Sequence, residues 1–88
     1  MSQEIIKMYG TSWCPDTERA RQCLKRNGIG YVWCDIEQDK QGCAFVEQVN
    51  KGKRRIPTIV FADGSILVEP SNVELENKLK RERKTVNE

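Results

Sequence analysis

The first 36 residues place a helical segment between two short apolar runs, and this order restricts the fold more than any other feature of the chain. The runs Glu4–Tyr9 and Tyr31–Ile36 are short, apolar and β-prone. Between them, the segment Ser12–Asn27 carries an apolar stripe at helical spacing and ends at an Asn-Gly stop signal. A helix that connects two strands of one sheet makes a right-handed crossover, so we predict that these two strands are parallel.

The second half of the chain predicts a further helix, a β-hairpin and a last helix. The helix is expected from about Lys40 to Asn50, and the strands of the hairpin at Ile56–Ala62 and Ser65–Val68. Asp-Gly between these two strands is the strongest short hairpin signal, and Ser71 begins a capping box that starts the last helix. The order β-α-β-α-β-β-α predicts an α/β fold in which a four-stranded mixed sheet has helices on both faces.

Length and composition restrict the class of protein. With 88 residues the chain forms a single domain, residues 1–88, and we expect the tail from about 80 to 88 to fray. The net charge of +2 is too small to indicate a nucleic-acid partner, and no apolar run approaches the roughly 20 residues that span a membrane. Because the N-terminus also lacks the features of a secretory signal, we expect a cytoplasmic protein. We also expect it to work as a monomer.

Cys14 stands where the first strand passes into the first helix. Pro15 suits the first helical position, since its missing N–H group would have no partner there. The free N–H groups and the positive end of the helix dipole favour an anion at such a place, and here the anion is a thiolate. Trp13 would flank the sulfur on the other side, whereas the nearby carboxylate of Asp16 works slightly against the thiolate. This environment predicts a reactive cysteine, and the alternative is a small apolar filler.

The other three cysteines are expected to be buried or incidental thiols in a reducing compartment. Cys23 is nine residues further along the same helix, so it lies roughly 13 Å from Cys14, whereas a disulfide needs Cα atoms within about 7 Å. Cys34 is predicted to point to the core side of the sheet, and Cys43 to lie on the opposite face from Cys14. Their spacing matches no paired zinc knuckle and the chain has no histidine, so no metal site is predicted.

The residues around Cys14 and Pro57 resemble those of a known family. The segments TSWC, VNKGKRRIPTIVFADGS and PSNVELENKL are similar to the glutaredoxin branch of the thioredoxin-like proteins, and most similar to mycoredoxin-type small glutaredoxins. The resemblance covers nearly the whole chain and implies thiol–disulfide exchange, in which Cys14 is the nucleophile and Ile56-Pro57 forms a cis-proline turn beside it. It also implies a role in electron transport and cell redox homeostasis, with protein mixed disulfides as partners.

The same resemblance implies a co-substrate, which is a low-molecular-weight thiol such as glutathione or mycothiol, and no bound cofactor. It places a carboxylate of this thiol at the start of the last helix. The residues expected to contact the co-substrate are Ser12, Arg55, Ile56, Pro57, Ser71 and Asn72, and those expected to support Cys14 are Trp13, Pro15 and Thr17.

Three positions depart from the family pattern. Thr17 stands where dithiol members have a second cysteine, Val68-Glu69-Pro70 replaces a common Gly-Gly pair, and Thr11 occupies the place of a lysine that many glutathione-binding members carry. We therefore predict a monothiol route, in which Cys14 exchanges with a mixed disulfide and a second small thiol then releases it. The hydroxyl of Thr17 would donate a hydrogen bond to the thiolate.

Other functions stay open at this stage. Loss of the second cysteine is also compatible with a non-catalytic module of the thioredoxin fold that binds a peptide or a thiol near Ile56-Pro57. The basic loop Lys51–Arg55 is either solvated or favours the thiolate of Cys14 and attracts carboxylates of the ligand. By analogy with the family, an iron–sulfur site shared by two copies through Cys14 is a further alternative, but the CGFS motif that accompanies such a site is absent.

Overall fold

The computed structural model describes residues 6–86, with the side chains of residues 6–81, and it contains a four-stranded sheet and three helices. The strands are β1 (Lys7–Gly10), β2 (Val32–Asp35), β3 (Thr58–Val60) and β4 (Ile66–Val68). The helices are α1 (Pro15–Arg26), α2 (Lys40–Val49) and α3 (Asn72–Val86). All the predicted elements are present in the predicted order, and the strands are shorter than expected.

The two ends of the chain differ in part from the prediction. The first two residues of the predicted strand Glu4–Tyr9 lie outside the described residues, as do the last two residues of the predicted tail. The backbone of α3 is helical through Val86, past residue 80 where we expected fraying to begin.

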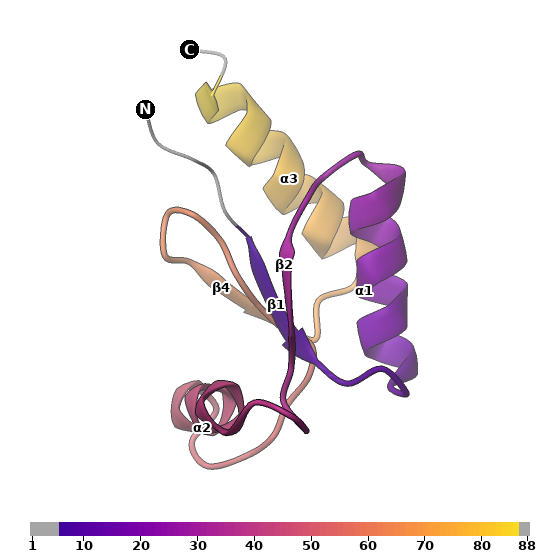
Figure 1. Cartoon of the computed structure of the whole chain (residues 1–88). Coiled ribbons are helices and arrows are strands. Elements are labelled where there is room, and N and C mark those ends of the chain that lie inside the picture. Colours follow the sequence, from indigo (N-terminus) through magenta and orange to yellow (C-terminus); the bar gives the residue numbers. More distant parts are fainter. Residues whose placement is uncertain (1–5, 87–88) are drawn as a thin grey trace.

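The sheet is mixed, with the strand order β2-β1-β3-β4. β1 pairs parallel to β2 and antiparallel to β3, and β4 pairs antiparallel to β3. Figure 1 shows α1 and α3 on one side of the sheet and α2 on the other. The predicted α/β class, with a four-stranded mixed sheet and helices on both faces, is confirmed.

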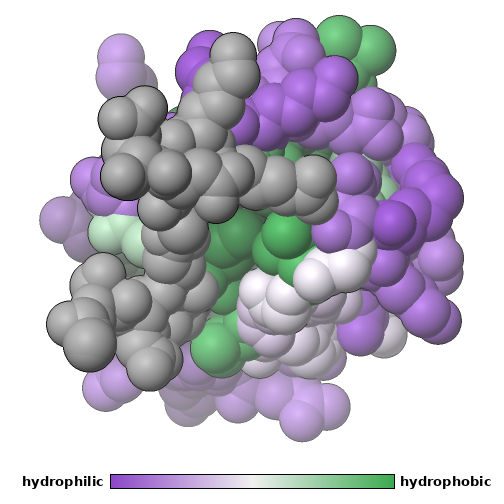
Figure 2. Space-filling view, turned by 90° about the horizontal axis from the view of Figure 1, so that it is seen from above, coloured by the Kyte–Doolittle hydropathy of each residue, from purple (hydrophilic) through white to green (hydrophobic). Residues whose placement is uncertain are grey.

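The main core lies between the sheet and the pair of helices α1 and α3. Met8 and Ile59 from the sheet are fully buried there, together with Leu24 of α1 and Leu75 of α3. Seen from above, hydrophilic residues form most of the rim of the molecule and hydrophobic residues lie nearer its centre (Figure 2). Burial of these side chains is the main favourable contribution to the stability of so short a chain.

The second helix covers the opposite face of the sheet through a smaller contact. The rings of Tyr9 and Phe45 pack with their centroids 4.9 Å apart, and Val46 is fully buried. The helix begins at the N-cap residue Asp39, whose side chain accepts hydrogen bonds from two backbone N–H groups of the first turn.

Cys34 lies outside the main core, contrary to our prediction. Its half-buried sulfur is 3.2 Å from the carboxylate of Asp39, at the start of α2. The neighbouring Trp33 points to the opposite face instead and packs against the main core. Side chains alternate between the two faces of a strand, so Cys34 and Trp33 point in opposite directions, and the face of Cys34 is the one that meets the smaller contact with α2.

One end of the sheet, here called the β1 carboxyl edge, brings together segments that are far apart in the sequence. β1 and β2 end at this edge, β3 begins there, and α1 starts after a four-residue loop that follows β1. Thr58 pairs with Tyr9 on one side and with Val68 on the other. Continuing this register by one residue places Pro57 between Gly10 and Glu69. This is the lower end of the molecule in Figure 1.

The β3–β4 hairpin is tied to α3 at its turn. Gly64 has a φ of +89°, which favours glycine, as the Asp-Gly signal predicted. The carboxylate of Asp63 accepts hydrogen bonds from the backbone and the hydroxyl of Ser65, at 2.9 and 2.6 Å, and from the Lys78 ammonium at 3.1 Å. The Lys78 side chain is almost fully buried and its nitrogen lies 5.2 Å from the centroid of the Phe61 ring. The bonds from Ser65 and Lys78 lower the pKa of Asp63 below its ordinary value of 3.8.

A lowered pKa makes the contribution of Asp63 to stability depend on pH. The contribution is present above pH 3.8 and is lost as the pH falls below that value, because the unfolded state then binds a proton more readily than the folded state does. We predict that Asp63→Asn lowers the thermal midpoint at pH 7, and that the gap to the wild type narrows between pH 4 and pH 2. Circular dichroism melts at several pH values measure this gap, and a gap that stays constant down to pH 2 would contradict the prediction.

Candidate active site

Cys14 is the N-cap residue of α1 and is partly exposed. Its backbone is extended (φ −83°, ψ 121°), Pro15 occupies the first helical position, and the carbonyl of Cys14 accepts a hydrogen bond from the N–H of Glu18 at 3.0 Å. The sulfur makes no capping hydrogen bond. Because the first-turn N–H groups have no partner within the helix, they point out of its end beside Cys14. The structure thus gives the cysteine the position that the sequence predicted.

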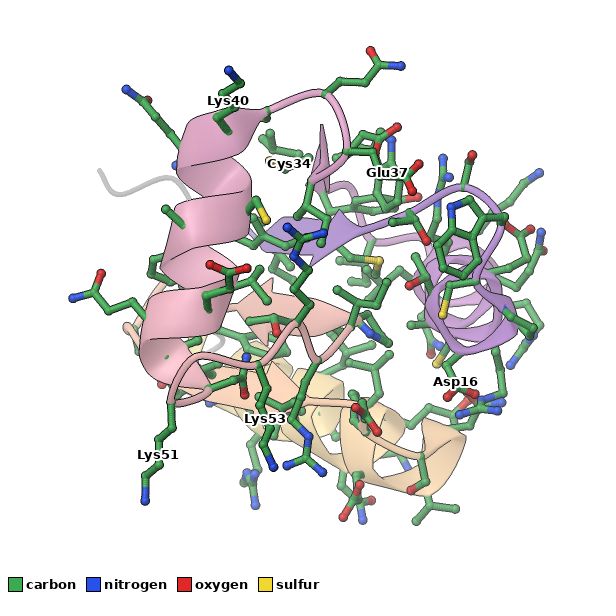
Figure 3. All side chains as sticks on the ribbon, turned by 90° about the horizontal axis from the view of Figure 1, so that it is seen from below. Asp16, Cys34, Glu37, Lys40, Lys51 and Lys53 are labelled. Carbon is green, nitrogen blue, oxygen red and sulfur yellow. The ribbon has the colours of Figure 1, made fainter. Side chains whose placement is uncertain are left out.

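Trp13 is 67% exposed and is held by a hydrogen bond to another element. Its Nε1–H donates to Oε2 of Glu37 at 3.0 Å, and the N–H of Glu37 donates to Oδ1 of Asp35 at 2.9 Å. Glu37 lies in the turn after β2 and Asp16 in the first turn of α1, and both are labelled in Figure 3. Our sequence reasoning missed Glu37, although polar residues just after parallel strands often gather at one edge of a sheet.

Thr17 is fully buried, and its side chain is directed at the end of β1. A Cβ atom added to Gly10 would lie 2.6 Å from Cγ2 and 2.7 Å from Oγ1 of Thr17. A side chain at position 10 would therefore push the first turn of α1 away from the sheet. Glycine at this position allows the helix to start close to the β1 carboxyl edge.

The hydroxyl of Thr17 has no hydrogen-bond partner among the described residues. The predicted hydrogen bond from Thr17 to the sulfur of Cys14 is therefore not formed in this structure. The buried hydroxyl of Thr11, in the loop that leads to Cys14, also lacks a partner. Unsatisfied buried hydroxyls are costly, so both of these stand out at the base of the Cys14 loop.

Pro57 follows a cis peptide bond from Ile56, as the resemblance implied. The turn is held from both sides: the hydroxyl of Thr58 donates to the carbonyl of Arg55 at 2.7 Å, and the N–H of Glu69 donates to the carbonyl of Pro57 at 2.9 Å. Thr58 itself is fully buried. These bonds fix the backbone of Ile56 and Pro57 at the β1 carboxyl edge, one strand away from the start of α1.

The start of α3 lies at the same edge and is capped by its own residues. The hydroxyl of Ser71 accepts from the N–H of Glu74 at 3.1 Å, and the N–H of Ser71 donates to Oε1 of Glu74 at 2.9 Å. This is the predicted capping box. A carboxylate that binds at Ser71 and Asn72 would have to replace the side chain of Glu74 at the Ser71 N–H group.

The basic loop is divided between two parts of the molecule. Arg54 pairs with Glu47 of α2 at 2.9 Å, whereas Arg55 pairs with Glu69 at 3.6 Å. In Figure 3 the side chain of Lys51 projects outwards beside α2, and that of Lys53 lies between α2 and α3 in the view, away from Asp16 in the first turn of α1. The four cations therefore do not gather around Cys14, and Arg55 is the member of the loop that borders Pro57. Ser12, the remaining predicted contact residue, is exposed in the loop before Cys14.

The other cysteines occupy three different places. Cys23 is fully buried, and burial together with the nearby carboxylate of Glu76 raises the pKa of its thiol. Burial and the hydrogen bond to Asp39 raise the pKa of Cys34 to about 11. Cys43 lines an open hollow of about 430 Å³ between α2 and the turn after β2. Cys14 is thus the cysteine at the start of α1, and the other three belong to different surroundings.

Two further properties concern only the part of the chain that the structure describes. Among these residues, no group of three or more cysteine, aspartate or glutamate side chains is arranged to hold a metal ion. Within residues 6–86, no helix has both the length and the apolar character required to cross a membrane.

Known structures define the class of this fold and site. The thioredoxin-like protein BC3987 superimposes with a TM-score of 0.70, at 22% identity, over 82% of this chain and 96% of that structure. The glutaredoxin of Archaeoglobus fulgidus superimposes with a TM-score of 0.65, at 25% identity, over 82% of each chain. The fold is therefore thioredoxin-like, with a cysteine at a helix start and a cis-proline at the β1 carboxyl edge.

Sequence comparison assigns the family within this class. The Glutaredoxin family model matches residues 6–66. A Mycobacterium tuberculosis protein named as a candidate glutaredoxin is 43% identical over 79 residues, which cover 90% of this chain and 94% of the relative. Mycoredoxin 1 of Corynebacterium glutamicum is 33% identical over 75 residues, which cover 84% and 91% of the two chains. The chain belongs to the glutaredoxin family and is a glutaredoxin-like redox protein.

The bond between Cys34 and Asp39 generates a prediction about reactivity. We expect Asp39→Asn to lower the pKa of Cys34 towards its ordinary value of 9.0, because the carboxylate that opposes the thiolate is removed. A fall of one unit in the pKa of Cys34 raises its thiolate fraction at pH 8 about tenfold. Iodoacetamide should therefore label Cys34 roughly tenfold faster in the variant. Peptide mass mapping gives the rate, with labelling of Cys43 in the same digest as the control. An unchanged rate at Cys34 would contradict the role of Asp39.

Proposed function

We propose that the protein catalyses thiol–disulfide exchange by a monothiol route, with the thiolate of Cys14 as the nucleophile. In the first step the thiolate attacks the small-thiol sulfur of a mixed disulfide, forms a disulfide with it and releases the protein partner as a thiolate. In the second step a second small thiol, as its thiolate, attacks that sulfur and releases Cys14 as a thiolate. One free small thiol enters and the disulfide of two small thiols leaves, so the number of disulfide bonds is unchanged: the sulfur of the partner is reduced to a thiol, and the entering small thiol is oxidised in its place.

The observation that carries this proposal is the position of Cys14 relative to the residue three places further on. Cys14 is partly exposed at the N-terminus of α1, whereas Thr17, at the place of a second cysteine, is fully buried and has no thiol. A helix N-terminus favours the charged form of a thiol. With no second sulfur in the first turn, the disulfide formed in the first step has to be resolved by a thiol from outside the chain.

The β1 carboxyl edge supports the choice of substrate. The backbone of Ile56, fixed before the cis-proline, and the start of α3 at Ser71 and Asn72 lie at this edge, and in this proposal they contact the disulfide that reacts with Cys14. We propose that a low-molecular-weight thiol, such as glutathione or mycothiol, is the co-substrate, that protein mixed disulfides are the partners, and that the reaction takes place in the cytoplasm. The protein would act as a monomer without a bound cofactor.

The nucleophile is tested by replacing single cysteines. We expect Cys14→Ser to abolish turnover of a mixed disulfide, because a hydroxyl does not ionise near neutral pH. Cys43→Ser should retain activity within about twofold of the wild type, because Cys43 lies on α2, away from the start of α1. A change of this size is what a surface substitution usually causes. A coupled assay with a glutathionylated or mycothiolated peptide measures both rates. Residual turnover in Cys14→Ser would refute the mechanism.

The absence of a resolving thiol is tested by restoring one. Side chains three residues apart on a helix lie about 5–6 Å from each other, which is within reach of a disulfide. We predict that Thr17→Cys forms an intramolecular disulfide with Cys14 on oxidation, whereas the wild type forms a mixed disulfide with the oxidant. Intact mass spectrometry separates a loss of two hydrogens from the gain of a small thiol. A wild type that closes an internal disulfide through Cys14 would contradict the monothiol route.

A further inference from the structure

Arg55 and Glu69 form an ion pair beside the cis-proline. Nε of Arg55 lies 3.6 Å from Oε2 of Glu69, and the backbones of both residues are tied to the turn. The carbonyl of Arg55 accepts from the hydroxyl of Thr58, and the N–H of Glu69 donates to the carbonyl of Pro57. The two charged side chains are therefore anchored at the β1 carboxyl edge while their ends are in solvent.

The geometry of this pair makes it easy to exchange. Its separation of 3.6 Å is longer than a good N–H···O hydrogen bond, and the side chains are 59% and 41% exposed. Exposed ion pairs of this kind contribute little to stability. A carboxylate from a ligand can therefore take the place of Glu69 on Arg55 at small cost.

Glu69 holds an unusual backbone conformation at this position. Its φ is +50°, in the left-handed region that glycine adopts readily and other residues avoid. The sequence thus places a charged side chain where the backbone conformation favours glycine. Adjacent strands are about 4.8 Å apart, so Glu69 lies two strands, or about 10 Å, from Gly10 across the edge. This span is within the length of a small thiol or of about three extended peptide residues bound at Cys14.

Other charges near the edge have different partners. Asp16, in the first turn of α1, pairs with Arg19 at 3.1 Å, and Glu37 accepts from Trp13. Arg54, next to Arg55 in the sequence, pairs with Glu47 on the side of α2. The Arg54–Glu47 pair is an arginine–glutamate ion pair like Arg55–Glu69, but it lies beside α2 and not at Pro57. It therefore offers a matched control.

We propose that Arg55 and Glu69 set the charge preference of the exchange at Cys14, with Arg55 receiving a carboxylate of the disulfide substrate in place of Glu69. This inference rests on the proposed function. Arg55 attracts disulfides that carry a carboxylate close to the sulfur, and Glu69 reduces this preference by competing for the same guanidinium. The effects are reversed for positively charged disulfides, because Glu69 attracts them and Arg55 repels them.

The test compares three symmetric disulfides of similar size and different charge. They are 3,3′-dithiodipropionate, which is anionic, bis(2-hydroxyethyl) disulfide, which is neutral, and cystamine, which is cationic. The rate at which each forms a mixed disulfide with Cys14 is followed by intact mass and peptide mapping at low ionic strength. The quantity that matters is the rate of each charged disulfide divided by that of the neutral one, because this ratio cancels any general loss of activity.

We expect opposite changes in two variants. Glu69→Gln should raise the anionic-to-neutral ratio by about threefold to fivefold, and Arg55→Gln should lower it by a similar factor, as removal of one exposed charge allows. The cationic-to-neutral ratio should change in the opposite direction in each variant. Salt at about 0.5 M should largely remove these differences, because it screens exposed charges. Glu47→Gln, which frees Arg54 instead, should leave both ratios within about twofold of the wild type.

The outcomes separate this inference from the function on which it rests. If Cys14 reacts but the two variants do not shift the ratios in opposite directions, the inference is overturned and the monothiol route stands. An equal shift in Glu47→Gln also overturns it, because the effect would then come from net charge and not from position. A wild type in which none of the three disulfides reacts at Cys14 overturns the proposed function, and this inference with it.

Discussion

The arrangement of the site depends on how closely the first turn of α1 approaches the end of β1. Thr17 occupies the space that a side chain at position 10 would need, so the helix can start at this point only because Gly10 has no Cβ atom. The next strand places Pro57 opposite Gly10 by continuation of the register. The close contact of Gly10 and Thr17 therefore sets where the Cys14 end of α1 stands, and the strand register sets which residue lies next to Gly10.

Three hydrogen-bond donors at the β1 carboxyl edge are already engaged by glutamates of the chain itself. Glu37 accepts from the indole of Trp13, Glu74 accepts from the N–H of Ser71, and Glu69 pairs with Arg55. In each case the partner of the donor is a carboxylate, so these donors suit a ligand that carries carboxylates. The carboxylates of such a ligand would have to displace these glutamate side chains from the donors. Binding would therefore break contacts within the protein, and the binding free energy would be smaller than the new hydrogen bonds alone suggest.

Local signals in the sequence predicted the elements, because capping residues, Asp-Gly and the strand–helix order act over a few residues. The position of the cis-proline was implied by the resemblance to the family. Contacts between distant segments were predicted less well. The partner of Trp13, the pairing of Arg55 with Glu69 and the side of the sheet that Cys34 faces all depend on strand register and on the placement of α2. The direction of Thr17 towards Gly10 was missed for the same reason, since it requires the position of α1 on the sheet.

The surroundings of the four sulfurs explain why one of them can carry the chemistry. Each of the other three has a carboxylate beside it: Glu76 is 4.0 Å from the sulfur of Cys23, Asp39 is 3.2 Å from that of Cys34, and Glu47 is 3.8 Å from that of Cys43.

Burial acts together with these carboxylates to raise the pKa of Cys23 and of Cys34. Cys14 has instead the open end of a helix and no side-chain cap. In a monothiol exchange a second reactive sulfur would divert the mixed disulfide into an internal bond, so the raised pKa values of Cys23 and Cys34 are compatible with the proposed route through Cys14.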